Sequence, residues 1–388
     1  MQHSSDRILT THAGSLPRPE ELTALHVRRA AGEAIGEAEF DAAVEEATRD
    51  VIAAQIEAGL DIVNNGEAGR ESFFTYVQHR MTGFGEASNR PVMADLTRYP
   101  GYLKQLAERS AGTESINLLT APKAVGEVRY AGSPAIEAEC AQLQRLLEPH
   151  RGRFGEAFVS SPSPGIVAAA MENAYYDDLE SYVAALAAAL RTEYQVIVQA
   201  GFVLQIDAPD LAMERHTLFQ DKPLSEFLDF VRVVVAAINE ALGGLARERV
   251  RLHVCWGNYE AAHDLDVPLA DIWPEISRVH AGGFLLSMAN PRHAHEYHLF
   301  DKGLLPRDAL LLPGVVDTTT NYVEHPEAVA DRIELAARAV GDPLRIIAGT
   351  DCGFETAAGF VSVAPDIAWA KLRALSEGAA LASKRLLG

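Results

Sequence analysis

The segment RLHVCWGN, residues 251–258, places a histidine and a cysteine, His253 and Cys255, two positions apart at the end of an apolar run. Alternate side chains of a β-strand point to the same face, so this imidazole and this thiol would lie side by side. Another cysteine, Cys352, ends the apolar run LRIIAGTDC. One histidine and two cysteines suit zinc, and three protein ligands leave one coordination position open for water or substrate. The alternative is that both cysteines are ordinary buried hydrophobic residues, because H-x-C alone is a weak pattern.

Carboxylates follow three other apolar runs in the same way. Glu67 ends LDIVNNGE, Asp207 ends FVLQID and Asp317 ends LLLPGVVD. A carboxylate after a strand often caps the next helix, and this alternative applies to Glu67 and Asp207 individually. Together on one face, these two side chains would instead form a site for a substrate ammonium or hydroxyl group.

Two further polar stretches carry weaker signals. PRHAHEYH, residues 291–298, is a candidate second metal cluster, or else a polar loop or helix start. VSSPSPG, residues 159–165, resembles turn chemistry, because the G-x-S-x-G pattern of a nucleophile elbow is absent. No glycine-rich phosphate-binding pattern follows a strand, so nucleotide binding has no support.

Composition limits the classes of partner. The 388 residues carry a formal net charge of −20, which argues against a nucleic-acid or anionic-membrane surface. The apolar runs are shorter than the roughly 20 residues that a membrane span needs. The first residues show no signal-peptide pattern, and three widely separated cysteines favour a reducing, cytoplasmic setting. We therefore expect small-molecule partners, with homo-oligomer formation left open.

Amphipathic helical segments alternate with short apolar runs along the chain. Four segments carry apolar residues at helical spacing, contain or end near Gly or Pro, and lead into an apolar run: residues 41–59, 181–201, 224–244 and 327–343. This alternation favours a TIM-type (β/α)8 barrel, with a doubly wound parallel sheet as the alternative.

Nine runs are candidate strands, one more than an eight-stranded barrel requires, so one of them lies outside the barrel: RILTTHAGS, LDIVNNGE, KAVGEVRY, EAFVSSPSP, FVLQIDAP, RLHVCWGN, GGFLLSMA, LLLPGVVD and LRIIAGTDC. Polar residues at the carboxyl ends of these runs decide for the barrel, because such ends converge on the face where barrel active sites are built. We expect residues 1–388 to form one catalytic barrel domain. The segment of residues 80–122 fits neither element well and is expected to be a loop insertion or lid.

These motifs, taken in order, resemble the C-terminal catalytic barrel of cobalamin-independent methionine synthase. They also resemble the single-barrel relatives of that family, which include epoxyalkane:coenzyme M transferase. LTTHAGSLPRP resembles the family's opening T-x-x-x-G-S-x-P, and DIVNNGEAGR, VLQIDAP, HVCWGN, PGVVD and GTDCG resemble its later motifs. The resemblance covers nearly the whole chain and is specific because the motifs occur together.

The resemblance implies roles for individual residues. His253, Cys255 and Cys352 would bind a zinc ion that holds the acceptor thiol as a thiolate. Glu67 and Asp207 would bind the amino group of homocysteine, with the backbone near Ser15 meeting its carboxylate. Two positions depart from the family pattern: Ser287 stands where the synthase has a fourth, glutamate zinc ligand, and Thr319 stands where it has a histidine that serves the folate leaving group.

The predicted function is therefore zinc-dependent alkyl transfer to a small thiol, first of all methyl transfer to homocysteine giving methionine. Asp207 would orient substrate, and Asp317 would act behind the metal or as a proton donor. The departures put a folate donor in doubt. The alternative is alkyl transfer to another thiol, such as epoxide opening by coenzyme M, whose sulfonate would need a cation from Arg18, Arg70 or Arg292. A zinc hydrolase or lyase is the candidate from another class.

Overall fold

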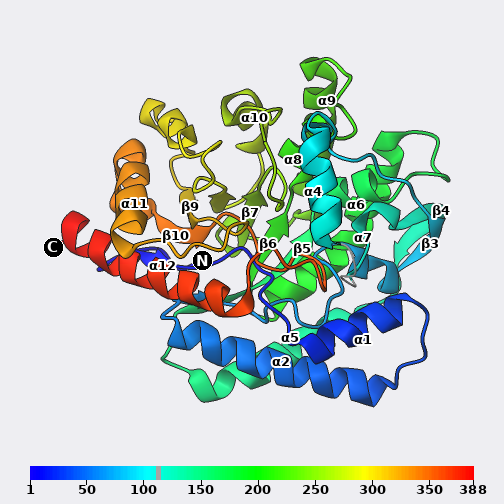
Figure 1. Ribbon diagram of the computed structural model, residues 1–388, viewed down its shortest axis with the longest axis horizontal. Helices are drawn as coiled ribbons and strands as arrows, with labels where there is room; N and C mark the ends of the chain where they lie inside the picture. Colours follow the sequence, from blue (N-terminus) through cyan, green and yellow to red (C-terminus); the bar gives the residue numbers. More distant parts are fainter. Residues whose placement is uncertain (111–114) are drawn as a thin grey trace.

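The computed structural model describes residues 1–110 and 115–388. Eight short parallel strands form one sheet in the order β1-β10-β9-β8-β7-β6-β5-β2, which curls into a nearly closed barrel (Figure 1). The prediction of a TIM-type barrel is confirmed, and the doubly wound sheet is wrong. The strands are β1 (Leu9–Thr10), β2 (Ile62–Val63), β5 (Glu156–Pro162), β6 (Val203–Asp207), β7 (Val250–Val254), β8 (Gly283–Leu286), β9 (Leu310–Val316) and β10 (Ile347–Thr350).

Helices surround the barrel and pack their apolar faces on the outside of the strands. In α9 the buried residues Phe227, Val231, Val234 and Ile238 recur at helical spacing, which explains why this segment folds as a helix against the sheet. The longer helices are α1 (Glu20–Ala30), α2 (Glu37–Glu57), α5 (Pro134–Leu147), α7 (Leu179–Gln199), α9 (Leu224–Ala241), α10 (Leu269–Ile276), α11 (Pro326–Val340) and α12 (Pro365–Leu386); the shorter α6 (Pro164–Ala170) and α8 (Asp210–Met213) follow β5 and β6.

The interior of the barrel is filled by its own small cluster of side chains. The inward-facing members come from seven strands and one adjoining loop: Leu9, Ala13, Ile62, Phe158, Val203, Leu285, Leu312 and Ile347. The barrel is therefore a packed core and not a channel, and the candidate site residues lie at the carboxyl ends of its strands.

The ninth strand candidate, KAVGEVRY, lies outside the barrel. It forms β4 (Pro122–Tyr130), which pairs in antiparallel fashion with β3 (Met81–Ala87) in a separate two-stranded sheet. Between these strands lie α3 (Ala94–Thr97), α4 (Pro100–Ser110) and a 3-10 turn, η2 (Leu118–Thr120). The predicted insertion, residues 80–122, thus begins at this hairpin and ends on its second strand.

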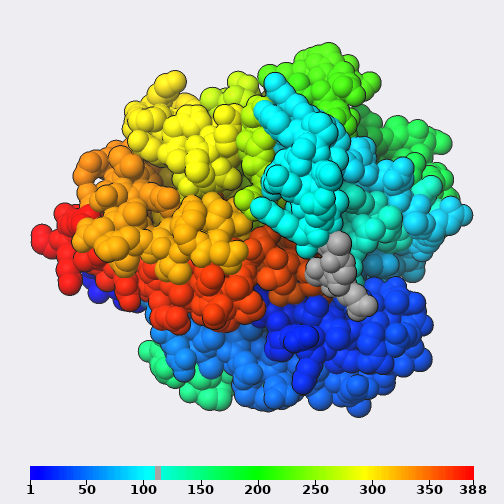
Figure 2. All heavy atoms as spheres, viewed as in Figure 1, coloured from blue at the N-terminus to red at the C-terminus, as the bar shows by residue number. Residues whose placement is uncertain are grey.

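The insertion packs against loops at the carboxyl end of the barrel. Arg90 forms a buried ion pair with Glu214, and the Tyr99 hydroxyl donates to Asp264 over 2.8 Å. Figure 2 shows this cyan segment lying against the yellow-green part of the chain that follows β7. The inserted segment therefore covers part of the face on which the strand-end residues gather. None of the helices in the described part of the chain combines the length and apolar character that crossing a membrane requires.

Candidate metal and substrate site

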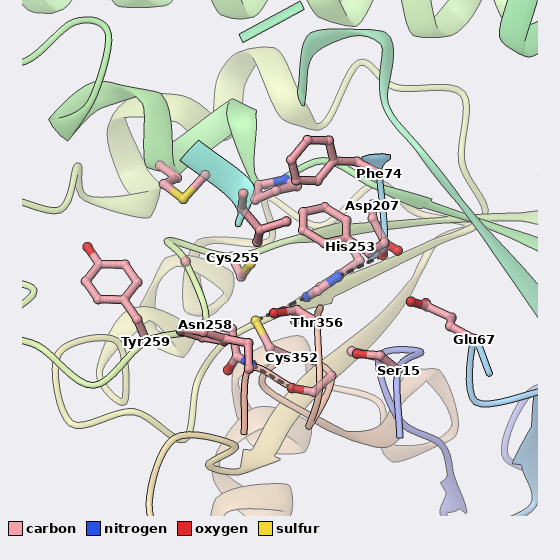
Figure 3. Close-up of a pocket in the computed structure, with 18 of the residues that line it drawn as sticks. Ser15, Glu67, Phe74, Asp207, His253, Cys255, Asn258, Tyr259, Cys352 and Thr356 are labelled. Carbon is pink, nitrogen blue, oxygen red and sulfur yellow. Dashed lines mark hydrogen bonds and ion pairs between the residues drawn. The ribbon is translucent and has the colours of Figure 1, made fainter. Parts of the chain in front are cut away.

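The three predicted metal ligands come together at the carboxyl ends of β7 and β10. His253 lies in β7, Cys255 directly follows it, and Cys352 follows β10. All three are buried, and their ligand atoms lie within 4.8 Å of one another (Figure 3). The Cys352 Sγ and His253 Nε2 atoms are 3.9 Å apart. Two residues nearly adjacent in sequence and one from a distant strand therefore form a single cluster.

The histidine is oriented by a neighbouring strand. Asp207 is paired in register with His253, and its Oδ1 atom lies 3.0 Å from His253 Nδ1. A carboxylate on one ring nitrogen fixes the imidazole and directs the other nitrogen toward a metal. Asp207 Oδ1 also accepts a 2.7 Å hydrogen bond from Gln205 Nε2, so this carboxylate is itself held in place.

The three side chains of the cluster share protons. Burial lowers the pKa of His253, but the Asp207 hydrogen bond and the Cys255 thiolate outweigh it and raise the pKa to about 10. The Cys352 thiol donates a hydrogen bond to Cys255, which, together with the His253 charge, depresses the pKa of Cys255 well below its usual value despite burial. A thiolate beside an imidazolium is the electrostatic state from which a cation displaces protons on binding.

Glu67 is held in an uncommon backbone conformation with a free carboxylate oxygen. Its φ angle is 59°, in the left-handed region that side chains other than glycine rarely adopt. Its Oε1 atom accepts a 2.7 Å hydrogen bond from Ser160 Oγ, whereas the buried Oε2 atom has no partner among the described residues. Burial first, and then the nearby Asp207 charge, raise the pKa of Glu67 to about 7. A buried oxygen without a partner is suited to a ligand donor.

One cavity joins these groups. It occupies about 870 Å³, including its opening to solvent. Its polar end is lined by Ser15, Glu67, Asp207, His253, Cys255 and Cys352, and Asn258 and Thr356 lie beside them. Figure 3 shows the Glu67 carboxylate and the Ser15 side chain on one side of the cysteine pair. The arrangement can hold a thiol at the metal cluster and a charged amino group near the carboxylates.

The chain is similar to known proteins over most of its length. The model of the catalytic domain of cobalamin-independent synthase matches residues 8–114 and 164–367, which include every residue of the cluster. The chain belongs to this family. The match leaves out residues 115–163, which include β4, α5 and the barrel strand β5.

Several methionine synthases are similar to nearly the whole of this chain. The methionine synthase of Thermococcus kodakarensis is 27% identical over 347 residues, covering 89% of this chain and 86% of that protein. The methionine synthase of Saccharolobus solfataricus is 26% identical and is covered over 95% of its length. The 5-methyltetrahydropteroyltriglutamate–homocysteine methyltransferase of Acidiphilium cryptum is a longer protein, and the match covers 40% of its length.

A solved structure has the same fold. The B12-independent methionine synthase from Shewanella sp. W3-18-1, in complex with selenomethionine, superposes with a TM-score of 0.74 at 22% identity. The superposition covers 98% of this chain and 99% of that one. At this identity the likeness shows that the present chain has the same barrel fold.

Arg70 is not among the residues that line the cavity shared by Glu67 and the cysteines. Its Nη1 atom donates to the backbone oxygen of Ser160 over 2.9 Å and to its hydroxyl over 3.1 Å. Its Nη2 atom pairs with Glu139 over 2.8 Å. The same Ser160 hydroxyl donates to Glu67, so Arg70 is linked to this carboxylate through Ser160. No geometric observation supports the predicted direct contact between Arg70 and the substrate.

Asp317 lies in a smaller adjoining cavity of about 290 Å³, beside Cys352. Its Oδ1 atom accepts hydrogen bonds from the Thr319 backbone over 2.6 Å and from the Thr319 hydroxyl over 2.7 Å. Ser287 lines the same small cavity, and its hydroxyl donates to the Asp351 backbone oxygen over 2.8 Å. The two departures from the family pattern, Ser287 and Thr319, therefore lie together behind the cysteine.

Sequence reasoning missed two residues that support this site. Asp351 accepts hydrogen bonds of 2.7–2.8 Å from three consecutive backbone N–H groups, those of residues 288–290, and so fixes the loop after β8 beside Cys352. Arg251 lies inside the barrel and donates to Gln205 Oε1 over 2.8 Å, which in turn holds Asp207. The alternation R-x-H-x-C was the available signal, since it places Arg251 on the same face as the ligands.

The histidine-rich segment 291–298 is a polar turn leading into the 3-10 helix η6 (Glu296–Lys302). Of its three histidines only His293 is buried, with Nε2 2.8 Å from Asp266. Asp266 also belongs to a second group with Asp95 and His263. Burial lowers the pKa of His263, but Asp266 raises it to about 8, and both ring nitrogens donate hydrogen bonds. A doubly protonated imidazole has no lone pair for a metal, so ion pairing accounts for this group.

Gly14 supplies the space that the Glu67 carboxylate occupies. Its φ angle is 134°, and a Cβ atom there would collide with Glu67 Oε1. We expect Gly14→Ala to displace this carboxylate and to weaken methionine binding by about tenfold, the loss of roughly one charge-assisted hydrogen bond. Gly152→Ala is the matched control, because Gly152 also has a positive φ, 82°, but open space around it. Calorimetric titration of both variants checks this; equal binding would contradict the proposed packing.

Proposed function

We propose that this chain is a zinc-dependent thiol S-methyltransferase that converts homocysteine to methionine. One observation carries the proposal: a buried His-Cys-Cys cluster with ligand atoms within 4.8 Å shares a cavity with the partnerless oxygen of Glu67. The cluster suits a thiol-binding metal, and the carboxylate suits an amino-acid ammonium. The methionine synthases that are similar to this chain support the same reading.

The donor set fits zinc. Two thiolate sulfurs and one imidazole nitrogen are preferred zinc ligands, and Asp207 already orients the imidazole. Zinc held by His253, Cys255 and Cys352 would keep a coordinated substrate thiol deprotonated near neutral pH. A free thiol has a pKa of about 8.5 and would otherwise be mostly protonated.

The other residues bind and orient the substrate. Glu67 and Asp207 accept the ammonium group, and the backbone near Ser15 meets the carboxylate. Arg70 acts as a positioning residue, because it holds the Ser160 hydroxyl that contacts Glu67. Asp317 is separated from the substrate cavity, so we assign it to positioning the loop around Thr319 behind Cys352.

The alternative acceptor, a sulfonate thiol such as coenzyme M, has less support. Its three candidate cations are engaged elsewhere: Arg18 donates to the Glu355 backbone over 2.8 Å, Arg292 donates to the His263 backbone over 3.0 Å, and Arg70 pairs with Glu139. Two carboxylates at the polar end of the cavity would repel the sulfonate. A hydrolase or lyase reaction would leave these carboxylates without a role.

The test is a thiol screen by mass spectrometry. The zinc-loaded protein is incubated with homocysteine, cysteine or coenzyme M and a panel of methyl and alkyl donors, and the S-alkylated products are identified. We expect methionine from homocysteine. Alkylation of coenzyme M alone would contradict the proposal and establish the alternative.

A further inference from the structure

A cluster of four buried charges lies next to the residues that hold the Glu67 carboxylate. Arg70 pairs with Glu139 over 2.8 Å. Arg80 also pairs with Glu139 and, over 3.0 Å, with Glu193. None of these four side chains is more than 13% exposed. Two positive and two negative charges balance in this cluster, so the loss of any one would leave a buried charge uncompensated.

Glu139 is the centre of the cluster. Its carboxylate contacts both arginines, and its Oε1 atom also accepts a 2.8 Å hydrogen bond from Asn65 Nδ2. Burial opposes ionisation, but the charges of Arg70 and Arg80 outweigh it and lower the pKa of Glu139 to about 2. The side chain therefore carries a full negative charge near neutral pH and holds three donors at once.

The contact with Asn65 leads to the Glu67 backbone. Asn65 Oδ1 accepts a 3.0 Å hydrogen bond from the backbone N–H of Glu67, in the kind of side-chain turn that asparagine favours. The φ angle of Glu67 is 59°, and a residue other than glycine keeps such a conformation only where its surroundings hold it. Because Glu139 fixes the amide nitrogen of Asn65, it helps to hold this backbone conformation.

A second route leads from Glu139 to the Glu67 carboxylate. Arg70, which pairs with Glu139, donates to the Ser160 hydroxyl over 3.1 Å. That hydroxyl donates in turn to Glu67 Oε1 over 2.7 Å, and Oε2 is the oxygen left without a protein partner. Both routes begin at one carboxylate and end at the two parts of Glu67, backbone and carboxylate, that determine where its free oxygen lies.

Glu139 reaches the site from a helix outside the barrel. It lies on α5, which packs against α2 and α7, whereas Asn65 and Arg70 lie in the loop after β2. Residues 115–163, which include this helix, fall in the gap of the match to the family. Neither the strand-end motifs nor the family match therefore assigns a role to Glu139.

We propose that Glu139 is a positioning residue that holds Glu67 for recognition of the substrate ammonium. This inference rests on the proposed function. Glu139 acts on the Glu67 backbone through Asn65 and on the Glu67 carboxylate through Arg70 and its bond to Ser160. It does not line the substrate cavity, so it acts without touching the substrate. Its loss weakens recognition of the ammonium group and leaves the metal cluster and the contacts to the rest of the substrate in place.

Two ligands that differ only in the amino group test this role. Methionine and γ-methylthiobutyrate, its analogue without the amino group, are titrated calorimetrically into the zinc-loaded protein and into Glu139→Gln. The amide keeps the size of the side chain and an acceptor for Asn65 but no longer attracts Arg70. We expect methionine to bind about fivefold more weakly and γ-methylthiobutyrate to bind as before. Unchanged methionine binding, or an equal loss for both ligands, would overturn the inference.

A double-mutant cycle shows whether Glu139 acts through Glu67. In a protein that already carries Glu67→Gln, Glu139→Gln should weaken methionine binding by less than about twofold further, because the group that it positions is gone. Losses that multiply fully would overturn the inference and leave the proposed function intact. If Glu67→Gln alone binds methionine as tightly as the unaltered protein, the proposed function loses its ammonium site, and the inference falls with it.

Two further variants separate positioning from folding. Asn65→Ala leaves the four charges paired and removes the link to the Glu67 backbone, so it tests the inference even if Glu139→Gln does not fold. We expect a loss of about fivefold for methionine alone, and an equal affinity to the unaltered protein would overturn the inference. Tyr130→Phe is the matched control, because its hydroxyl donates to Glu193 in the same cluster over 2.7 Å. A selective loss of methionine binding in Tyr130→Phe as large as in Glu139→Gln would also overturn it.

Discussion

Purified protein is expected to carry about one zinc ion per chain, and the double substitution Cys255→Ser with Cys352→Ser is expected to abolish zinc binding. The two thiolates supply most of the ligand field, and neither serine oxygen would be deprotonated near neutral pH. His253 and its Asp207 partner would remain, but a single imidazole does not retain zinc against dilution. Metal analysis after dialysis measures the loss.

Cys140→Ser is the matched control for this experiment. Cys140 is also a buried free cysteine, but it packs in the main hydrophobic core from α5, away from the cavity-lining residues. Its variant should retain the full zinc content even if it is somewhat less stable. Full zinc retention in the double variant, or equal loss in Cys140→Ser, would remove the metal centre on which the proposed function depends.

The ligand cluster could be predicted from the sequence because it depends on two simple periodicities. Strand alternation places His253 and Cys255 on one face, and barrel geometry gathers strand ends such as Cys352. Both rules act through the backbone, so they hold without knowledge of side-chain packing. The observed cluster follows them directly.

Other features depend on packing that one-dimensional patterns do not record. KAVGEVRY has the composition of a barrel strand, and its pairing with β3 follows from the insertion that brings the two segments together. Like the predicted metal ligands, Asp317 lies at the carboxyl end of a barrel strand. Its side chain nevertheless accepts a hydrogen bond from the Thr319 backbone in the adjoining cavity. Arg70 is diverted in the same way, because Glu139 on α5 offers it a buried partner. Strand position thus predicts the face that a residue reaches but not its final contact.

Glu67→Gln is expected to weaken methionine binding by about tenfold or more, because a buried charge-assisted hydrogen bond contributes roughly 1.5–3 kcal/mol. The carboxylate oxygen that has no protein partner is the one available to an ammonium group. An amide in its place carries no charge and accepts fewer hydrogen bonds. Methionine is the suitable probe because its thioether does not titrate. The zinc content should be unchanged, since Glu67 is not among the clustered ligands.

The same carboxylate should make binding depend on pH. Burial and the nearby Asp207 raise the pKa of Glu67 to about 7, so its charged form is lost as the pH falls through neutrality. The methionine ammonium stays protonated over this range, and its affinity should therefore fall about tenfold between pH 8 and pH 6, as expected for one linked proton. Calorimetric titrations at both pH values should show this fall in the unaltered protein and in Glu180→Gln, an exposed control on α7. Glu67→Gln should bind weakly at both pH values, because the titrating group is gone. A variant that keeps the original affinity and the original pH dependence would show that the ammonium is held elsewhere.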